Sequence, residues 1–233
     1  MRDRSDGRVG TQHVDVAGID AQGRVSPRRA PVPEERQRDA ERTRQHLLAA
    51  ALDEFAAKGY AGARVHDIAA AAGVNKQLIS YYFGGKDGLY RELQRIWEQR
   101  EAAFADPEVP LPELAVRYLR DALADPRMMR LLLWRSLAAE SGPPRGPGGE
   151  ESAGMRRRQA RGELAADLDP GAVVLMLMGA VAAPVAMRQM VWRVTGLDPE
   201  TPEFEEYFAE QLGRMVRRLT GPDPGSNDAG PPG

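Results

Sequence analysis

Apolar residues recur at helical spacing along most of this chain. Between Leu48 and Phe55 they fall at positions i, i+3, i+4 and i+7, which places them on one face of an α-helix. Strictly alternating, β-branched runs of the kind that strands need are absent. The pattern therefore predicts an all-α protein, with helices over residues 39–58, 65–72, 76–82, 86–104, 111–124, 126–140, 151–167, 170–195 and 202–219.

Local signals mark several of the predicted helix ends. Gly59 and Gly73 follow the first two helices, where a residue in the left-handed conformation commonly ends a helix. Asn75 is expected to cap the third helix, and Thr201, which a proline follows, is expected to cap the last. The second helix follows Arg64, which brings no capping hydroxyl.

Composition narrows the class of protein. The 233 residues include no cysteine, which excludes disulfides, thiolate metal sites and cysteine nucleophiles, and which fits a reducing cytoplasm. Three scattered histidines and no clustered carboxylates provide no catalytic or metal-binding constellation, so we expect neither an enzyme nor a cofactor. The most apolar run, residues 172–187, is shorter than the roughly 20 residues of a membrane span and contains Gly179 and Pro184. We expect a buried helix there.

The second and third predicted helices, joined by a turn at Gly73, have the layout of a helix-turn-helix, whose second helix enters the major groove of DNA. At about 100° per residue, Ile79 and Phe83 lie on one side of the third helix and can be buried against its neighbours. Gln77 and Tyr81 then lie on the opposite side. Such a face suits base edges and phosphates. Because the formal net charge is −2, DNA binding would depend on local charge.

The same outline also occurs in helical proteins that do not bind DNA. In that alternative the adjacent Tyr81 and Tyr82 are a half-buried staple. The protein would then be a helical ligand-binding or protein-interaction module that no longer reads DNA. Salt-dependent DNA binding separates the two interpretations.

Residues 44–90 resemble the DNA-binding domain of TetR-family transcriptional regulators. The resemblance is carried by AALDEFAAKGY at the end of the first helix, by DIAAAAGV in the second helix, and by YYFGGKDGL at the junction of the third and fourth helices. It implies an all-α homodimer whose N-terminal helices read a palindromic operator in double-stranded DNA, and whose divergent C-terminal bundle binds a small effector.

Taken residue by residue, the resemblance implies DNA contacts from the second helix, the third helix and the start of the fourth. Ser80 stands where the family commonly has a tyrosine that contacts a phosphate, so we expect that contact to pass to Tyr81 or Tyr82. The expected DNA-binding residues are Arg64, His66, Lys76, Gln77, Leu78, Ser80, Tyr81, Tyr82 and Lys86.

The part of the chain after the proline-rich residues 107–112 is rich in methionine and tryptophan. These side chains adapt to irregular apolar cavities, although ordinary core packing is the alternative. Eight arginines between residues 127 and 161, against three glutamates, would either attract an acidic ligand or line a solvated helix face. The expected residues of an effector pocket are Met128, Leu132, Trp134, Met176 and Met187.

These observations predict a domain order. We expect a disordered N-terminal arm at residues 1–36, a helix-turn-helix DNA-binding domain at 37–85, a helical ligand-binding and dimerisation domain at 86–220, and a disordered tail at 221–233. The resemblance places the homodimer interface on the last two helices. The sequence thus predicts a cytoplasmic regulator without a membrane partner, a repressor of nearby genes that an unidentified small apolar effector releases from DNA.

Overall fold

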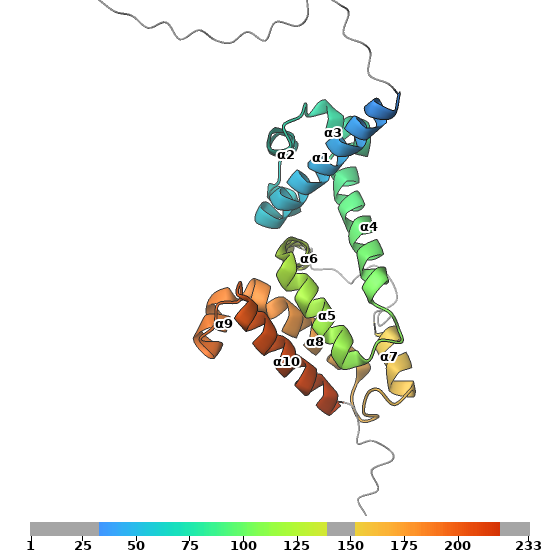
Figure 1. The fold of residues 1–233 in the computed structure, drawn as a ribbon, viewed down its shortest axis with the longest axis vertical. Coiled ribbons are helices and arrows are strands. Elements are labelled where there is room, and N and C mark those ends of the chain that lie inside the picture. The colour runs from blue at the N-terminus through green and yellow to red at the C-terminus, as the bar shows by residue number, and fades with distance from the viewer. Residues whose placement is uncertain (1–32, 139–151, 220–233) are drawn as a thin grey trace, which may run out of the picture. The chain divides into compact units, whose positions relative to one another are not determined.

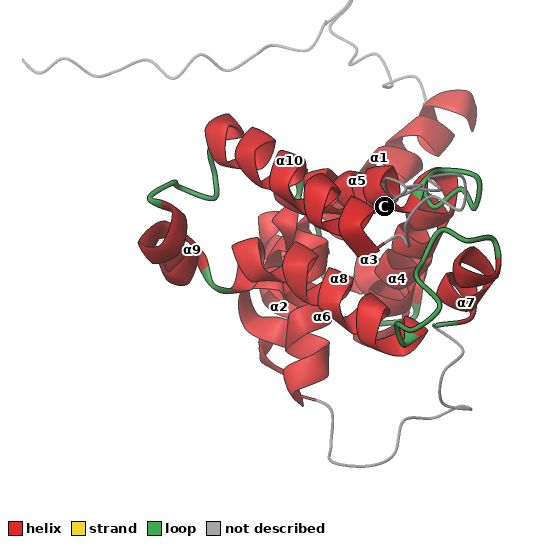
Figure 2. Ribbon diagram, turned by 90° about the horizontal axis from the view of Figure 1, so that it is seen from below, coloured by secondary structure: helices red, strands yellow, loops and turns green. Residues whose placement is uncertain are grey.

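The computed structural model of the chain describes residues 33–138 and 152–219. The chain divides into two compact units, Met1–Glu41 and Arg42–Gly233, and the first is described only for residues 33–41, which open helix α1. Helices and loops make up the described ranges, with no strand in them (Figures 1 and 2), so the all-α prediction is confirmed. The helices are α1 (Pro33–Gly62), α2 (Val65–Ala71), α3 (Gln77–Phe83), α4 (Lys86–Phe104), α5 (Leu111–Ala124), α6 (Pro126–Ala138), α7 (Ala153–Ala160), α8 (Pro170–Ala186), α9 (Arg188–Thr195) and α10 (Pro202–Leu219).

Most predicted helix ends agree with the structure to within a few residues. Helix α1 begins at Pro33, ahead of the expected start at residue 39, and it therefore includes residues 33–36 of the predicted arm. Gly59, which was expected to end this helix, has a φ of 68° and kinks it. The rest of the predicted arm, the glycine-rich loop at 142–149 and the tail at 221–233 lie outside the described residues.

The prediction of one helix over residues 170–195 is wrong. Helix α8 ends at Ala186, and α9 follows at an angle of 97°. Pro184 lacks an N–H group, and its ring crowds the carbonyl one turn earlier, so the helix is weakened at this point. Met187 then leaves the helical conformation, with φ −125° and ψ 45°.

The prediction of a helix over residues 151–167 is also too long. Helix α7 covers only Ala153–Ala160, and Gly162, with a φ of 81°, reverses the chain just beyond it. Two backbone carbonyl oxygens beyond this point accept hydrogen bonds from a side chain, and not from the N–H groups of a continuing helix. The Gln159 amide donates to the carbonyl oxygens of Ala165 (2.9 Å) and Leu168 (2.8 Å).

A first core forms among the N-terminal helices. The predicted stripe on α1 is confirmed, because Ala51 and Phe55 are fully buried and Leu48 is 8% exposed. Ile68 from α2 and Ile79 from α3 join the same cluster. The core therefore fixes α2 and α3 against α1, although neither helix is long enough to be stable alone.

A second core forms among α5, α7, α8 and α10. Helices α5 and α10 lie side by side (Figure 1), with Leu119 and Val216 fully buried between the packed elements. Helix α8 contributes Val173 and Val181 to this core, but Leu175 on its other side is 71% exposed. The expectation that residues 172–187 form a buried helix is thus correct for one face only.

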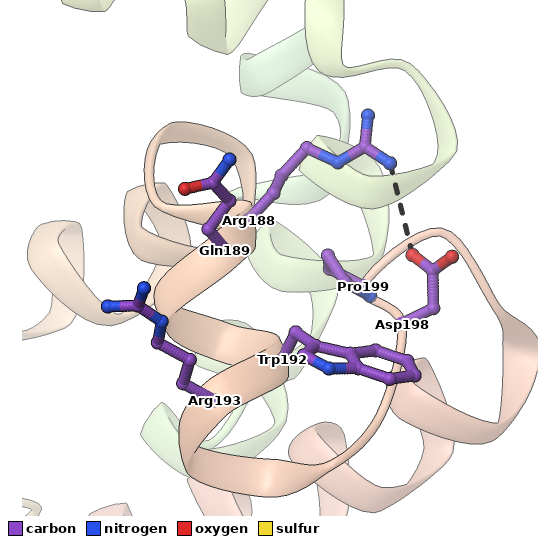
Figure 3. A pocket seen from close by; sticks show the side chains of 6 residues that line it. All are labelled: Arg188, Gln189, Trp192, Arg193, Asp198 and Pro199. Atoms are coloured by element: carbon purple, nitrogen blue, oxygen red, sulfur yellow. Dashed lines mark ion pairs between the residues drawn. The ribbon is translucent and has the colours of Figure 1, made fainter.

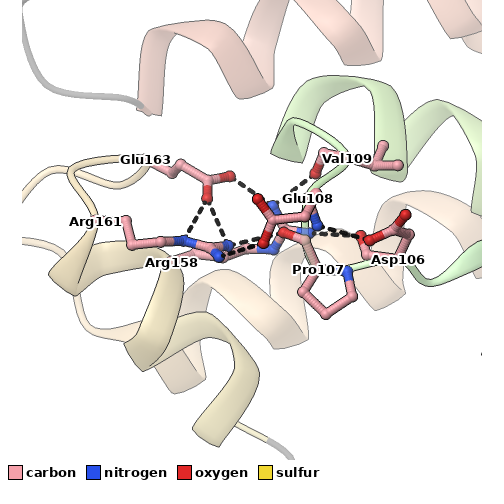
Figure 4. A network of polar contacts seen from close by, with 7 residues as sticks. All are labelled: Asp106, Pro107, Glu108, Val109, Arg158, Arg161 and Glu163. Carbon is pink, nitrogen blue, oxygen red and sulfur yellow. Dashed lines mark hydrogen bonds and ion pairs between the residues drawn. The ribbon is translucent and has the colours of Figure 1, made fainter.

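Arg158 is buried, and it connects the end of α7 to the loop between α4 and α5 (Figure 4). Its Nη1 donates to the carbonyl oxygen of Val109 at 2.8 Å and to the carboxylate of Glu163 at 2.5 Å. Arg161 continues the network, donating to the Pro107 carbonyl at 2.8 Å and pairing with Glu163 at the same distance. These two arginines of the predicted surplus therefore stabilise the fold.

Among the described residues, no single helix is long and apolar enough to cross a membrane. Helices α8 and α9 would reach that length and apolarity only as a sharply bent pair.

Candidate nucleic-acid interface

Helices α2 and α3 form the helix-turn-helix that the sequence predicts. Gly73 has a φ of 67°, a conformation that side chains with a Cβ rarely adopt, and it allows the chain to reverse after α2. Asn75 Oδ1 then accepts a hydrogen bond from the Gln77 N–H at 2.9 Å, as expected for a residue that caps α3. The first turn of α2 has no side-chain cap after Arg64, also as expected.

One side of α3 is anchored and the other is exposed. Ile79 is fully buried, and Phe83 packs partly against the same core, as the wheel geometry predicted. On the opposite side Gln77 is exposed, and Tyr81 is 78% exposed. This short helix is thus fixed by one face while the other remains accessible to a partner.

The structure divides the nine predicted DNA-binding residues into two groups. Three of them, Leu78, Tyr82 and Lys86, are partly buried, and Leu78 and Tyr82 also pack against the N-terminal core. All three therefore lie at the edge of the predicted DNA-binding surface. The exposed ones are Arg64, His66, Lys76, Gln77, Ser80 and Tyr81.

The start of α4 carries a set of contacts that the sequence did not predict. Lys86 Nζ lies 4.5 Å from the centre of the Tyr60 ring, and the Tyr60 hydroxyl donates a hydrogen bond to the Asp87 carboxylate. The Tyr60 ring is held by Phe55, stacked at 5.9 Å, and by Tyr90, edge-on at 5.0 Å. Tyr60 is remote from Lys86 in the sequence, and the only local signal was its place at the end of the AALDEFAAKGY motif.

Cations on this surface differ in how far they are neutralised. Lys58 pairs with Glu54 at 2.6 Å and with Asp67 at 3.3 Å. Across residues 33–138 and 152–219, neither Arg64 nor Lys76 forms an ion pair. Their charges are therefore available to an anionic partner such as a phosphate.

Behind the interface, Glu92 of α4 pairs with two arginines. Arg95 and Arg44 hold the pKa of its carboxyl at about 2, below its ordinary value, because their hydrogen bonds favour the charged form. Arg44 lies on α1, so this pair connects α1 with α4.

Helix α6 packs against α1 of the same N-terminal core. Leu131 is 3% exposed and belongs to that core. The Trp134 indole N–H donates to the Ala56 carbonyl at 3.2 Å, and Arg127 pairs with Asp53 at 2.8 Å. The apolar pattern of α6 could not show which of the two cores would receive its side chains.

The residues predicted for an effector pocket lie on α6 and at α8. Met128 packs partly against the N-terminal core, while Leu132 and Trp134 are 38% and 42% exposed. Met176 and Met187, both about half exposed, lie on α8 and at the corner that follows it. The pocket therefore stays a prediction.

Two hollows in the described part of the chain lie elsewhere. One, of about 690 Å³, is open to solvent and contains the ion pair between Arg188 and Asp198 at 3.9 Å (Figure 3). The other, of about 250 Å³, lies where α6 begins and α8 ends. The first is lined by Arg188, Gln189, Trp192, Arg193, Asp198 and Pro199, and the second by Leu123, Pro126, Arg130, Pro184, Val185, Arg188, Pro199 and Glu200.

Comparison with known proteins gives matches over both parts of the chain. Residues 47–93 match the family model described as bacterial regulatory proteins, tetR family, and residues 110–218 match the one described as tetracyclin repressor-like, C-terminal domain. The HTH-type transcriptional repressor SCO4008 of Streptomyces coelicolor is 32% identical over 193 residues, which cover 78% of this chain and 98% of that protein. The HTH-type transcriptional regulator RutR of Escherichia coli K12 is 28% identical over 195 residues, which cover 78% of this chain and 92% of RutR. Among solved structures, SCO4942 of Streptomyces coelicolor, a candidate transcriptional regulator, superimposes with a TM-score of 0.57 at 27% identity, covering 74% of this chain and 97% of that one.

Proposed function

Because the chain belongs to the TetR family and is a DNA-binding transcriptional regulator, we propose that it represses nearby genes by binding a palindromic operator through α2, α3 and the start of α4. The observation that carries this proposal is the two-sided α3. Ile79 anchors one side in the core, while Gln77 and Tyr81 stay exposed on the other.

The exposed residues of α3 suit distinct roles in DNA binding. Gln77 brings the donor and the acceptor that bond an adenine edge in the major groove, and the exposed ammonium group of Lys76 suits a phosphate. Ser80 has only a short hydroxyl, whereas Tyr81 is 78% exposed and Tyr82 is partly buried. We therefore assign the phosphate contact at this point to Tyr81 rather than to Tyr82.

The homodimer is proposed to form through α8 and α10. A wholly apolar helix such as α8 requires cover on every side, yet Leu175, Met176 and Met178 are between 46% and 71% exposed. Helix α10 adds Tyr207 and Met215, which are 42% and 49% exposed. A second copy of the chain would bury this face and pair two recognition helices, which predicts an operator with two-fold symmetry.

Release from DNA is proposed to pass through α6. This helix contacts α8 at one side and the N-terminal core at the other. Trp134 and Arg127 of α6 are bonded to Ala56 and Asp53 of α1, so an effector that displaces α6 would also move α1. Binding would then favour a dimer whose recognition helices no longer match two successive grooves.

Selection of DNA from a random duplex pool tests the DNA-binding part of this proposal. The full chain is expected to recover a palindromic duplex, and Lys76→Ala is expected to flatten the dependence of log binding constant on log salt by about 0.9. Lys58→Ala is the matched control, because that ammonium is already paired with two carboxylates and its loss should leave the slope unchanged. Recovery of no duplex, or binding that does not respond to salt, would favour a helical module that no longer reads DNA.

A further inference from the structure

Tyr60 contacts both members of an adjacent pair of opposite charges. The ammonium group of Lys86 lies 4.5 Å from the centre of its ring, and its hydroxyl donates a hydrogen bond to the Asp87 carboxylate. The face of an aromatic ring attracts a cation, whereas a phenolic O–H donates to an anion. One side chain therefore holds the two neighbouring charges at different places.

The ring of Tyr60 is fixed well enough to do this. It is stacked on Phe55, whose side chain is fully buried, with the two planes 20° apart. Tyr90 of α4 meets it edge-on at 5.0 Å. Because packing on both neighbours restricts the ring, the positions of Lys86 and Asp87 are restricted with it.

Without this ring the two charges would be free to approach one another. Consecutive side chains on a helix do not face each other, but Lys86 and Asp87 both contact the one Tyr60 side chain, so the long flexible stem of lysine would let its ammonium group reach the carboxylate once the ring is gone. An ion pair between them would cancel the positive charge that attracts a phosphate. A cation held on a ring face, by contrast, keeps its charge and turns some of its N–H donors away from the ring.

We propose that Tyr60 is a positioning residue for DNA binding, which separates Lys86 from Asp87 and presents the ammonium group to a phosphate. The inference rests on the proposed function, in which Lys86 at the start of α4 contacts the DNA backbone. Tyr60 itself need not touch the DNA.

A double-mutant cycle on the full chain tests this role. The probe is the tightest-binding duplex recovered from the random pool, and its binding is followed by fluorescence anisotropy over a range of salt concentrations. Lys86→Ala is expected to reduce the salt slope by about 0.9. Tyr60→Leu is expected to weaken binding about two- to fivefold and to reduce the slope in part. In the Lys86→Ala background, Tyr60→Leu should weaken binding no further.

A second cycle uses a variant that keeps the aromatic packing. Tyr60→Phe retains the ring and loses only the hydroxyl that holds Asp87. It should weaken binding, because the released carboxylate can then pair with Lys86. Asp87→Asn removes a negative charge near the DNA in any background, but it should strengthen binding by a larger factor in Tyr60→Phe than in the otherwise unchanged chain. This rescue would not occur if Tyr60 only stabilised the fold.

The outcomes separate the inference from the function on which it rests. If the unchanged chain recovers no duplex, or Lys86→Ala leaves affinity and slope as they were, the phosphate contact itself is wrong and the inference falls with it. If Lys86→Ala acts as expected, but Tyr60→Leu weakens binding by the same factor with and without Lys86, only the inference is overturned. Equal effects of Asp87→Asn in both backgrounds would overturn it as well.

Discussion

The anchoring of α3 by a single buried residue makes Ile79→Ala a demanding test of the proposed interface. Helix α3 has seven residues, well below the roughly 12 to 15 that an isolated helix needs to be even marginally stable in water. Ile79 is its only buried residue. The helix is therefore held in place by packing, in which Ile79 is the fully buried member and Phe83 packs partly against the same core.

The magnitude follows from the burial of this side chain. Replacing isoleucine by alanine removes three carbon atoms, whose transfer from water is worth about 2 to 3 kcal/mol at about 0.8 kcal/mol each. Because Ile79 is fully buried, a cavity remains and adds to the loss. We expect the free energy of unfolding to fall by about 3 kcal/mol, and the melting temperature by about 6 to 12 °C for a chain of this size.

DNA binding should fall further than global stability alone would cause, since the lost contacts are those of the recognition helix. Urea unfolding and salt-dependent anisotropy with the selected duplex measure the two effects separately. Ile79→Val, expected to cost about 0.5 to 1.5 kcal/mol, provides the graded comparison. Leu137→Ala removes as much apolar surface from a side chain that is 81% exposed, and should change neither quantity. Normal affinity in Ile79→Ala, measured where the protein is folded, would refute the view that this residue holds the interface in place.

Three further predictions concern charge, assembly and the buried arginine. The Glu92 carboxyl has a pKa of about 2 in the folded protein against an ordinary 4.5, so the stability that its ion pairs add to the fold is present above about pH 4.5 and is lost as the pH falls through about 2. Glu92→Gln should therefore be less stable than the unchanged chain near neutral pH and should lose less stability on acidification. Urea titrations across that pH range would show both effects. Leu175→Arg should convert the proposed dimer to a folded monomer in sedimentation experiments and should weaken operator binding. Leu137→Arg, at a position that is more exposed and lies outside α8 and α10, should stay dimeric, and an unchanged dimer in the first variant would contradict the proposed interface. Arg158→Met should lower the free energy of unfolding by about 2 to 3 kcal/mol, because backbone carbonyls lose a charged hydrogen-bond donor. Arg156 lies on the exposed face of the same helix, and the free energy of unfolding of Arg156→Met should lie within about 0.5 kcal/mol of that of the unchanged chain in the same assay.

Signals that act within a few residues allowed much of the N-terminal part to be predicted. The spacing of Ile79 and Phe83 placed both on the inner side of α3, and the same spacing placed Tyr81 outside. Gly73 and Asn75 set the turn before it through their own backbone and side-chain geometry. These predictions succeeded because the responsible interactions lie within one or two helical turns of the residues concerned.

Predictions that depended on distant partners were incomplete or wrong. The continuous helix over residues 170–195 failed at Pro184, whose effect depends on whether the surrounding packing supports a kinked helix or a sharp corner. The apolar run of α8 predicts a helix that is buried on all sides, but the rest of the chain covers only one face of it and leaves Leu175 exposed. The role of Trp134 in a pocket stays a prediction, and the sequence did not show that its indole N–H would donate to the Ala56 carbonyl of α1.

The sequence by itself determined the all-α class, the helix-turn-helix and the outward face of its second helix, because helical periodicity and turn chemistry are properties of neighbouring residues. Only the tertiary structure decided which groups from separate helices meet. Tyr60 shows the difference. The sequence gives its place directly after Gly59, but its contacts with Lys86 and Asp87 exist only because the N-terminal core brings the end of α1 to the start of α4.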